Sequence, residues 1–404
     1  MRIIYISKAI PPNELSEAST SRIIENNMAC GVAEMLNYQY KDKLKCYSMQ
    51  PRVKEKGYYK VAKRRKAKLP CGIETEVLLG ITTPILSVAI GFFSLIKVLR
   101  KEVLQSINNG EDNIVIVTYN AGAPSSVAIN FLPNKIKIKR IAVLFDAPVI
   151  VLNSTPTKNL ILRLWNTMAK YFFNKYDAAI TVAEKCVTDF SDDMEYLQIL
   201  MGTQSNMLKL KFDKIKLEKE IIIGYAGNLA KHNGLILLIE SMKYLPPNYR
   251  LVIMGNGKLE RYVIEKSNID PRIIFKGLLD TNEVLKEYNK CNILTIIRCG
   301  GDRVSDYLLK YGTSSKLSEL MLTGKPVITS EIEANPKQFN EFLNVVDDLT
   351  PETVALKIRD ITKSDSEYEK YCEKAASGRK YYMEKGTWKY QSKQVYEFIA
   401  SIVK

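Results

Sequence analysis

Residues 221–242 read IIIGYAGNLAKHNGLILLIESM. An unbroken apolar run leads into a turn that contains Gly224 and Gly227, and Leu235, Leu238 and Met242 then recur at helical spacing. A run that is apolar throughout, without alternation, is typical of a parallel strand buried on both faces. The segment therefore predicts a strand, a glycine turn and a helix, which is the repeating unit of an α/β fold.

The same order recurs along the chain, so the predicted class is α/β, with two Rossmann-like parallel-sheet domains at about 1–205 and 206–385. A basic stretch at 209–219 is expected to link them. Residues 384–404 are expected to form a closing helix, its segment 386–404 packing back on the first domain through Trp388, Tyr390, Tyr396 and Phe398. Further strands are expected at residues 3–6, 114–118, 141–145, 178–182, 250–254, 273–275, 293–297 and 327–329.

The composition of the 404-residue chain is that of an ordinary globular protein, with 46% hydrophobic and 25% charged residues. Its seven cysteines are scattered, odd in number and never spaced CxxC, which argues against a zinc site or a disulfide framework and indicates a reducing compartment. His232 is the single histidine, so most histidine-based metal and triad chemistry is excluded.

The net charge of +15 lies mostly in the first half, where residues 1–212 contain 29 Lys and Arg against 18 Asp and Glu. The densest run, 52–68, has nine cations offset by Glu55 alone. Three interpretations stay open for this run: anionic lipid headgroups, a solvated loop, or nucleic acid. No RNA- or DNA-binding signature supports the last, so no nucleic-acid partner is expected.

Residues 77–96 are apolar and uncharged over twenty positions, the length of a membrane span. A span here would separate the first strand from the strands with which it must pair. We therefore expect a helix from about Pro84 to Ser106, with a buried helix, an interfacial membrane patch and a true span as the alternatives. Residues 52–99 together are expected to form the membrane-facing segment. The apolar run RIIYI is too short for a signal peptide.

The second half resembles the nucleotide-sugar-binding domain of GT-B glycosyltransferases, most closely the family 4-like enzymes that build bacterial capsule and exopolysaccharide. The similarity is carried by residues 223–242, RLVIMGNG at 250–257, residues 273–297, and SSKLSELMLTGKPVITS at 314–330. The first half is similar more loosely. The resemblance implies a GT-B fold with two domains facing a cleft, and transfer of a sugar from a nucleotide donor without a metal or cofactor.

Candidate donor-binding residues lie at strand ends and at one helix start. Gly227 lets backbone approach a phosphate, and a short helix over 316–323, capped by hydroxyl residues and ended by Gly324, places Ser315 and Lys316 at an anion-favouring N-terminus. Glu319 is one turn further on, and the resemblance implies that it holds the ribose hydroxyls. Gly255-Asn256-Gly257 is either a turn or a nucleotide contact.

The sequence departs from the family pattern where the family has an arginine, a lysine and a glutamate, which here read Asn228, Asn233 and Tyr311. Because a diphosphate leaving group needs charge stabilisation, we expect Arg298 and Arg303, with Lys316, to replace the missing cations. Asn228 remains a candidate donor contact.

Asp146 follows the expected strand 141–145, where the resemblance places a catalytic or acceptor-binding group. It would be the general base of an inverting enzyme, or would orient the acceptor in a retaining one. The loop 7–21 is expected to cover the acceptor, with Ser7 and Arg22 as contacts.

These predictions together describe a cytoplasmic bacterial glycosyltransferase, peripheral on the inner face of the cell membrane. Its donor is a nucleotide sugar, with a UDP-sugar favoured by the resemblance, and its acceptor is a lipid-linked saccharide. Two alternatives stay open: a non-catalytic GT-B partner subunit, favoured by Asn228, Asn233 and Tyr311, and a nucleotide-sugar 2-epimerase.

Overall fold

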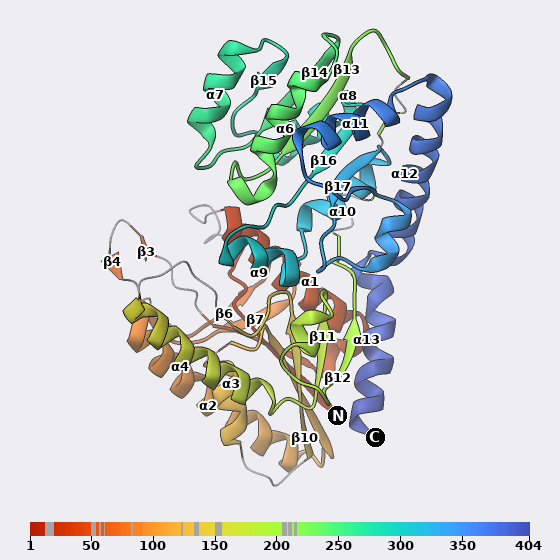
Figure 1. The fold of residues 1–404 in the computed structure, drawn as a ribbon. Helices are drawn as coiled ribbons and strands as arrows, with labels where there is room; N and C mark the ends of the chain where they lie inside the picture. The colour runs from red at the N-terminus through yellow and green to blue at the C-terminus, as the bar shows by residue number, and fades with distance from the viewer. Residues whose placement is uncertain are drawn as a thin grey trace. The chain divides into compact units, whose positions relative to one another are not determined.

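The computed structural model describes residues 1–12, 20–49, 54–55, 58–59, 61–81, 84–122, 124–132, 137–149, 156–203, 208, 212–213 and 216–404. The chain forms two compact units. The N-terminal unit comprises Met1–Gly202 and Thr387–Lys404, and the C-terminal unit comprises Thr203–Gly386. Each contains one large sheet with helices packed on it (Figure 1).

The sheet of the N-terminal unit has eight described strands in the order β12-β11-β10-β9-β1-β2-β7-β6. Its pairs are parallel except β6 with β7, which is antiparallel. The strands are β1 Arg2–Ser7, β2 Leu44–Ser48, β6 Arg65–Lys68, β7 Glu74–Val77, β9 Asn113–Tyr119, β10 Lys137–Leu144, β11 Ala178–Thr181 and β12 Glu195–Gln198. Two short pairs accompany them: β3 Lys54–Glu55 with β4 Tyr58–Tyr59, and β5 Val61–Ala62 with β8 Gly80–Ile81.

Helices cover both faces of this sheet. On one face, α1 (Thr20–Tyr40) and α13 (Trp388–Val403) pack on each other and share a core with alternate residues of the central strands, such as Ile3 and Tyr5 of β1. Figure 1 shows α2 (Pro84–Asn108), α3 (Ser125–Ala128) and α4 (Pro156–Phe173) on the other face. The short helices are η2 Lys41–Lys43, η3 Ile129–Phe131 and α5 Lys185–Thr188.

The C-terminal sheet has the order β15-β14-β13-β16-β17-β18, and every pair is parallel. Its strands are β13 Ile221–Ala226, β14 Tyr249–Met254, β15 Ile273–Phe275, β16 Ile293–Ile296, β17 Val327–Ser330 and β18 Asn344–Val346. Its helices are α6 Leu235–Ser241, α7 Glu260–Ile269, α8 Thr281–Lys290, α9 Arg303–Tyr311, α10 Ser315–Thr323, α11 Pro351–Ile361 and α12 Asp365–Lys385, with η5 Lys231–Asn233, η6 Met242–Tyr244 and η7 Lys337–Glu341.

These sheets confirm the predicted α/β class with two parallel-sheet domains. All nine strands expected from apolar runs are present. The sequence reading missed the outer strands β12 and β18, because β12 has exposed residues at both ends and β18 is only three residues long. Helix α10 begins at Ser315 and ends at Thr323, followed by Gly324 with a left-handed φ of 67°, as the hydroxyl residues and the glycine predicted.

The end of the chain corrects the expected closing helix over 384–404. Helix α12 continues to Lys385, and α13 begins only at Trp388, with the Thr387 side chain accepting a hydrogen bond from the backbone N–H of Tyr390. Trp388 is buried, but Tyr390 and Tyr396 are 39% and 44% exposed. The interior face of α13 is instead formed by Val395, Ile399 and Ile402.

The apolar stretch 77–96 divides between two elements. Val77 ends β7, and the helix expected from Pro84 to Ser106 is α2, which is buried along one side and exposed along the other. Among the described residues, no helix combines the length and the apolar character that crossing a bilayer requires. Several positions of the basic run 52–68 and of the expected linker 209–219 lie outside the described residues.

Candidate functional site

Each sheet has one place where the strand order reverses direction. In the C-terminal unit the chain runs from β13 outward to β15, then returns to β16 and runs outward to β18 on the other side. Connections after β13 and β16 therefore leave in opposite directions and open a crevice at the carboxyl ends of these two strands. Gly227 and Asn228 follow β13, and Arg298 follows β16, so three predicted donor-binding residues lie at this switch point.

The turn after β13 is fixed by close packing of backbone on backbone. Gly255 has φ +130°, and a Cβ there would lie 1.9 Å from the carbonyl oxygen of Gly227. Asn228 is held by its own carbonyl oxygen, which accepts hydrogen bonds from the Tyr225 hydroxyl and from the Asn233 amide, each at 2.8 Å. Asn233, at the position where the family has a lysine, therefore stabilises this turn. The same packing requires glycine at position 255.

Arg298 has a structural partner. Its Nη1 donates to the carbonyl oxygen of Leu308 at 2.9 Å and also to that of Gly312, so it caps the C-terminal end of α9. Burial lowers the pKa of the guanidinium. His232 is near it, and the pKa of His232 is lowered by partial burial and by the charge of Arg298, with Asp302 acting in the opposite sense.

The first turn of α10 carries the predicted diphosphate and ribose contacts together. Lys316 Nζ lies 2.7 Å from Glu319 Oε2, and the two side chains are 33% and 29% exposed, so they form a half-buried ion pair across one helical turn. Ser315 is the first residue of the helix, and its carbonyl oxygen accepts a hydrogen bond from the Ser318 hydroxyl. Arg303 is exposed at the start of α9, and the Tyr311 ring lies 5.1 Å from that of Tyr307 in a tilted arrangement at its end.

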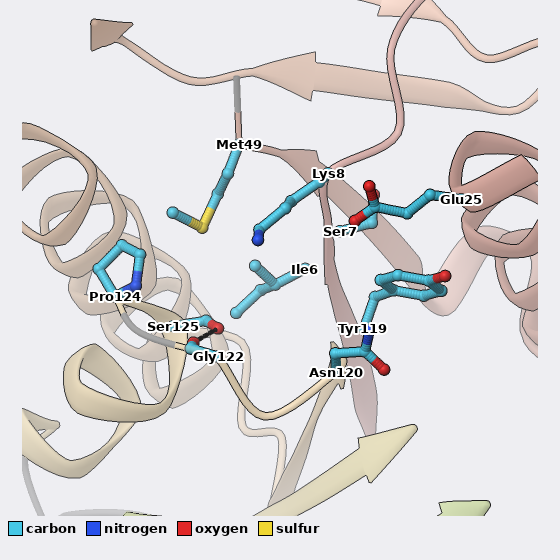
Figure 2. Close-up of a pocket in the computed structure, with 10 residues that line it drawn as sticks. All are labelled: Ile6, Ser7, Lys8, Glu25, Met49, Tyr119, Asn120, Gly122, Pro124 and Ser125. Carbon is cyan, nitrogen blue, oxygen red and sulfur yellow. Dashed lines mark hydrogen bonds between the residues drawn. The ribbon is translucent and has the colours of Figure 1, made fainter. Parts of the chain in front are cut away.

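In the N-terminal unit the strand order reverses between β1 and β9. A hollow lies at the carboxyl ends of these strands, and Figure 2 shows the Lys8 side chain reaching into it between Met49 and Ile6. Its open volume of about 20 Å³ suits one water molecule or one hydroxyl group, not a whole sugar ring. The other lining residues are Ser7, Glu25, Tyr119, Asn120, Gly122, Pro124 and Ser125.

Asp146 follows β10 beside this hollow. Its Oδ2 accepts a hydrogen bond from Asn120 Nδ2 at 3.3 Å, while Asn120 Oδ1 accepts one from the backbone N–H of Phe145 at 2.9 Å. One side of the Asp146 carboxylate is open to solvent. The atoms packed around its other sides exclude water, which raises its pKa, and the negative charge of Glu25 raises the pKa further. The Asn120 hydrogen bond and the charge of Lys8 act in the opposite direction.

Of the two predicted acceptor contacts, the structure describes the side chain of Ser7 but not that of Arg22. Ser7 lines the hollow, but it is buried and its Oγ accepts a hydrogen bond from the backbone N–H of Ala9 at 3.2 Å. The side chain of Arg22, and residues 13–19 of the expected acceptor loop, lie outside the described residues. Sequence reasoning missed Lys8, Glu25 and Asn120, although a polar residue directly after the apolar strand β9 was a usable signal. The described residues contain no group of three His, Cys, Asp or Glu side chains placed to hold a metal ion.

Comparison with known proteins identifies the C-terminal half. Residues 207–379 match the family model described as glycosyl transferases group 1. The second half of this chain is a group 1 glycosyltransferase domain. No curated protein sequence matches the chain.

Solved structures match the chain over nearly its whole length. They include the lipopolysaccharide outer core galactosyltransferase WaaB (TM-score 0.66, 11% identity, 98% of this chain and 100% of that one). Sucrose-phosphate synthase from Thermosynechococcus elongatus (0.62, 14%, 100% and 99%) and Anabaena HepE in complex with UDP (0.62, 13%, 99% and 100%) are equally complete matches. At these identities the structures establish the fold, which is GT-B, and the family match over residues 207–379 supports a glycosyltransferase enzyme.

Proposed function

We propose that this glycosyltransferase moves a sugar from a UDP-sugar to a hydroxyl group of a lipid-linked saccharide during the synthesis of a bacterial surface polysaccharide such as capsule or exopolysaccharide. HepE has been solved with UDP and with UDP-glucose, which supports the donor class. WaaB acts on the lipopolysaccharide outer core, which supports a surface saccharide as acceptor.

The donor would be bound by the C-terminal unit, proposed as residues 206–385. Glu319 accepts hydrogen bonds from the ribose hydroxyls, and Lys316 binds the diphosphate beside Ser315 at the N-terminus of α10. Gly227 and Asn228 offer backbone to the phosphates at the switch point. The proposal rests on the Lys316–Glu319 ion pair, which presents a cation and a carboxylate from one helical turn. A donor whose ribose lies next to its diphosphate needs these two groups side by side, the carboxylate for the ribose and the cation for the diphosphate.

Arg298 would contribute mainly through its charge, since its Nη1 already binds two carbonyl oxygens. A buried cation at the end of β16 raises the local positive potential, which stabilises the leaving diphosphate without direct contact.

The acceptor would be bound by the N-terminal unit, proposed as residues 1–205 with the returning helix 386–404. Asp146 takes the proton from the acceptor hydroxyl as its oxygen bonds to the anomeric carbon, while the bond from that carbon to the diphosphate oxygen breaks and UDP leaves. That role belongs to an inverting reaction; in a retaining one Asp146 orients the acceptor. Ser7 and Arg22 stay proposed acceptor contacts. A lipid-linked acceptor implies a cytoplasmic enzyme held peripherally at the inner face of the cell membrane.

The donor proposal is tested by calorimetric titration of the Glu319→Ala variant with uridine and with UDP. Uridine binding should weaken by about 1–3 kcal/mol, the value of hydrogen bonds to a charged group. UDP should lose less, because Lys316 is released from its ion pair and is free for the diphosphate. Hydrolysis of a panel of nucleotide sugars without acceptor then identifies the sugar.

Glu265→Ala is the matched control, since Glu265 is an exposed helical glutamate of the same unit in α7. It should leave both affinities unchanged. Wild-type uridine affinity in the Glu319→Ala variant would remove Glu319 from the site.

A further inference from the structure

The outer side of α2 and α4 is an exposed surface that mixes apolar and basic side chains. On α2, Leu86, Phe93 and Leu104 are exposed and lie two and three turns apart, so they share one stripe of the helix. Phe93 is 67% exposed. Contact with water does not stabilise large apolar side chains. Their alignment along one stripe of the helix therefore indicates an interaction surface.

The cations of α2 occupy the same side. Lys97, Arg100 and Lys101 are exposed, whereas Glu102, the single acidic residue of the helix, is buried and paired with Arg2 at 2.8 Å. The exposed side of α2 therefore combines an apolar stripe with positive charge alone.

Helix α4 repeats this combination. Leu164, Met168 and Tyr171 are exposed, with Leu164 at 62%, and Arg163 and Lys170 are exposed beside them. The sequence of α4 contains no acidic residue. Lys175, just beyond the helix, lies over the Tyr171 ring at 5.1 Å.

Helix α3 joins the two surfaces. It contacts both α2 and α4, and Figure 1 shows the three helices together on the same face of the sheet. Phe131, in the turn η3 that continues α3, packs edge-on against Phe92 of α2 at 5.7 Å while remaining exposed. The α2–η3–α4 surface is thus one region of the N-terminal unit.

We propose that the α2–η3–α4 surface docks on an anionic phospholipid bilayer. Aromatic and aliphatic side chains enter the boundary between headgroups and acyl chains, and lysine and arginine pair with lipid phosphates at the same depth. A second copy of this chain fits less well, because cations of both copies would meet. The inference rests on the proposed peripheral location, and it extends the expected contact from the α2 part of residues 52–99 to η3 and α4.

Flotation with vesicles tests the docking directly. The full-length protein should float with vesicles of phosphatidylcholine mixed with phosphatidylglycerol, less with phosphatidylcholine alone, and less as salt is raised. Arg100→Gln with Lys170→Gln should weaken partition about 30-fold, since each basic residue near the surface contributes about fivefold. Phe93→Ser with Leu164→Ser should weaken it at least as much.

Matched controls come from the C-terminal unit. Ile269 and Leu278 are as exposed as the apolar pair, and Lys258 and Lys286 are exposed cations. Ile269→Ser with Leu278→Ser, and Lys258→Gln with Lys286→Gln, should float as the wild type does. Thermal unfolding by circular dichroism checks that every variant is folded.

Three results would overturn the docking: wild-type protein that does not float with anionic vesicles, surface variants that float as well as the controls, or a dimer in sedimentation that Phe93→Ser with Leu164→Ser dissociates. Titration with UDP keeps this test separate from the transferase proposal. Protein that binds UDP but not vesicles disproves the docking alone, and protein that floats but binds no nucleotide disproves the donor site alone.

Discussion

At the scale of single residues, the hydrogen bond from Asn120 lowers the pKa of the proposed base, Asp146, against the larger effect of desolvation. Its left-handed φ of 51° aims one amide at both Asp146 and the Phe145 backbone. Asn120→Gly keeps this backbone conformation accessible and removes the hydrogen bond that lowers the pKa of Asp146. That pKa, already raised by desolvation, should therefore rise further. Because the base must be ionised, the acidic limb of the kcat/KM profile should move to higher pH.

Asn130→Gly is the comparison variant, since Asn130 is in the same unit and donates its amide to a backbone carbonyl oxygen, that of Ser126 at 2.7 Å, and not to Asp146. Its acidic limb should coincide with that of the wild type. If Asn120→Gly lowers the rate equally at every pH, Asn120 supports the structure and does not tune Asp146.

The site residues that sequence could reveal were those set by spacing within one element. Lys316 and Glu319 had to share a helical face, and they form an ion pair. Arg298 shows the limit: its position after a strand was readable, but its carbonyl partners at Leu308 and Gly312 depend on how the next helix ends. Lys8 and Glu25 come together with Asn120 only through the strand order, which residue spacing does not contain.

At the scale of elements, the loop after β14 must carry glycine for the turn after β13 to keep its shape. Gly255→Ala would place a Cβ 1.9 Å from the Gly227 carbonyl oxygen at a φ that only glycine adopts readily. We expect a loss of about 3 kcal/mol or more in unfolding free energy, measured by urea denaturation, together with weaker UDP binding. Gly277→Ala separates strain from contact, because Gly277 also has positive φ but nothing within 4 Å. It should cost about 1 kcal/mol and leave UDP affinity intact.

Among elements, burial decided what the sequence could predict. Strands such as β1 and β13 are buried on both faces, so their apolar runs were visible. Strand β12 has an exposed–intermediate pattern with Glu195 at its start, and it is held by pairing with β11. Backbone pairing of this kind leaves no apolar pattern to read. The break between α12 and α13 had a readable signal, Gly386 followed by the N-cap Thr387, which the predicted helix over 384–404 did not use.

At the scale of the whole molecule, the last helix belongs to the unit in which the chain began. Trp388 lies between Gly31 of α1 and Gly202, and a Cβ at either glycine would come within 2.2 Å of the indole ring. The indole ring also packs edge-on against Phe145, with centroids 6.4 Å apart. Phe145 directly precedes the proposed base, Asp146, in the sequence. The core of the N-terminal unit is therefore closed by the final helix, far along the sequence from the strands that it covers.

Trp388→Ala should accordingly destabilise the N-terminal unit and spare the C-terminal unit. Removing a fully packed indole costs about 3–5 kcal/mol, because the two glycines cannot fill the cavity that it leaves. Hydrogen exchange resolved by peptide should show faster exchange in β1, β9 and α1, with β13 and β14 unchanged. Trp165→Ala provides the internal comparison, since Trp165 of α4 is only half-buried and should cost less. Equal loss of protection in both sheets would mean that the units unfold as one, and that Trp388 stabilises the molecule as a whole.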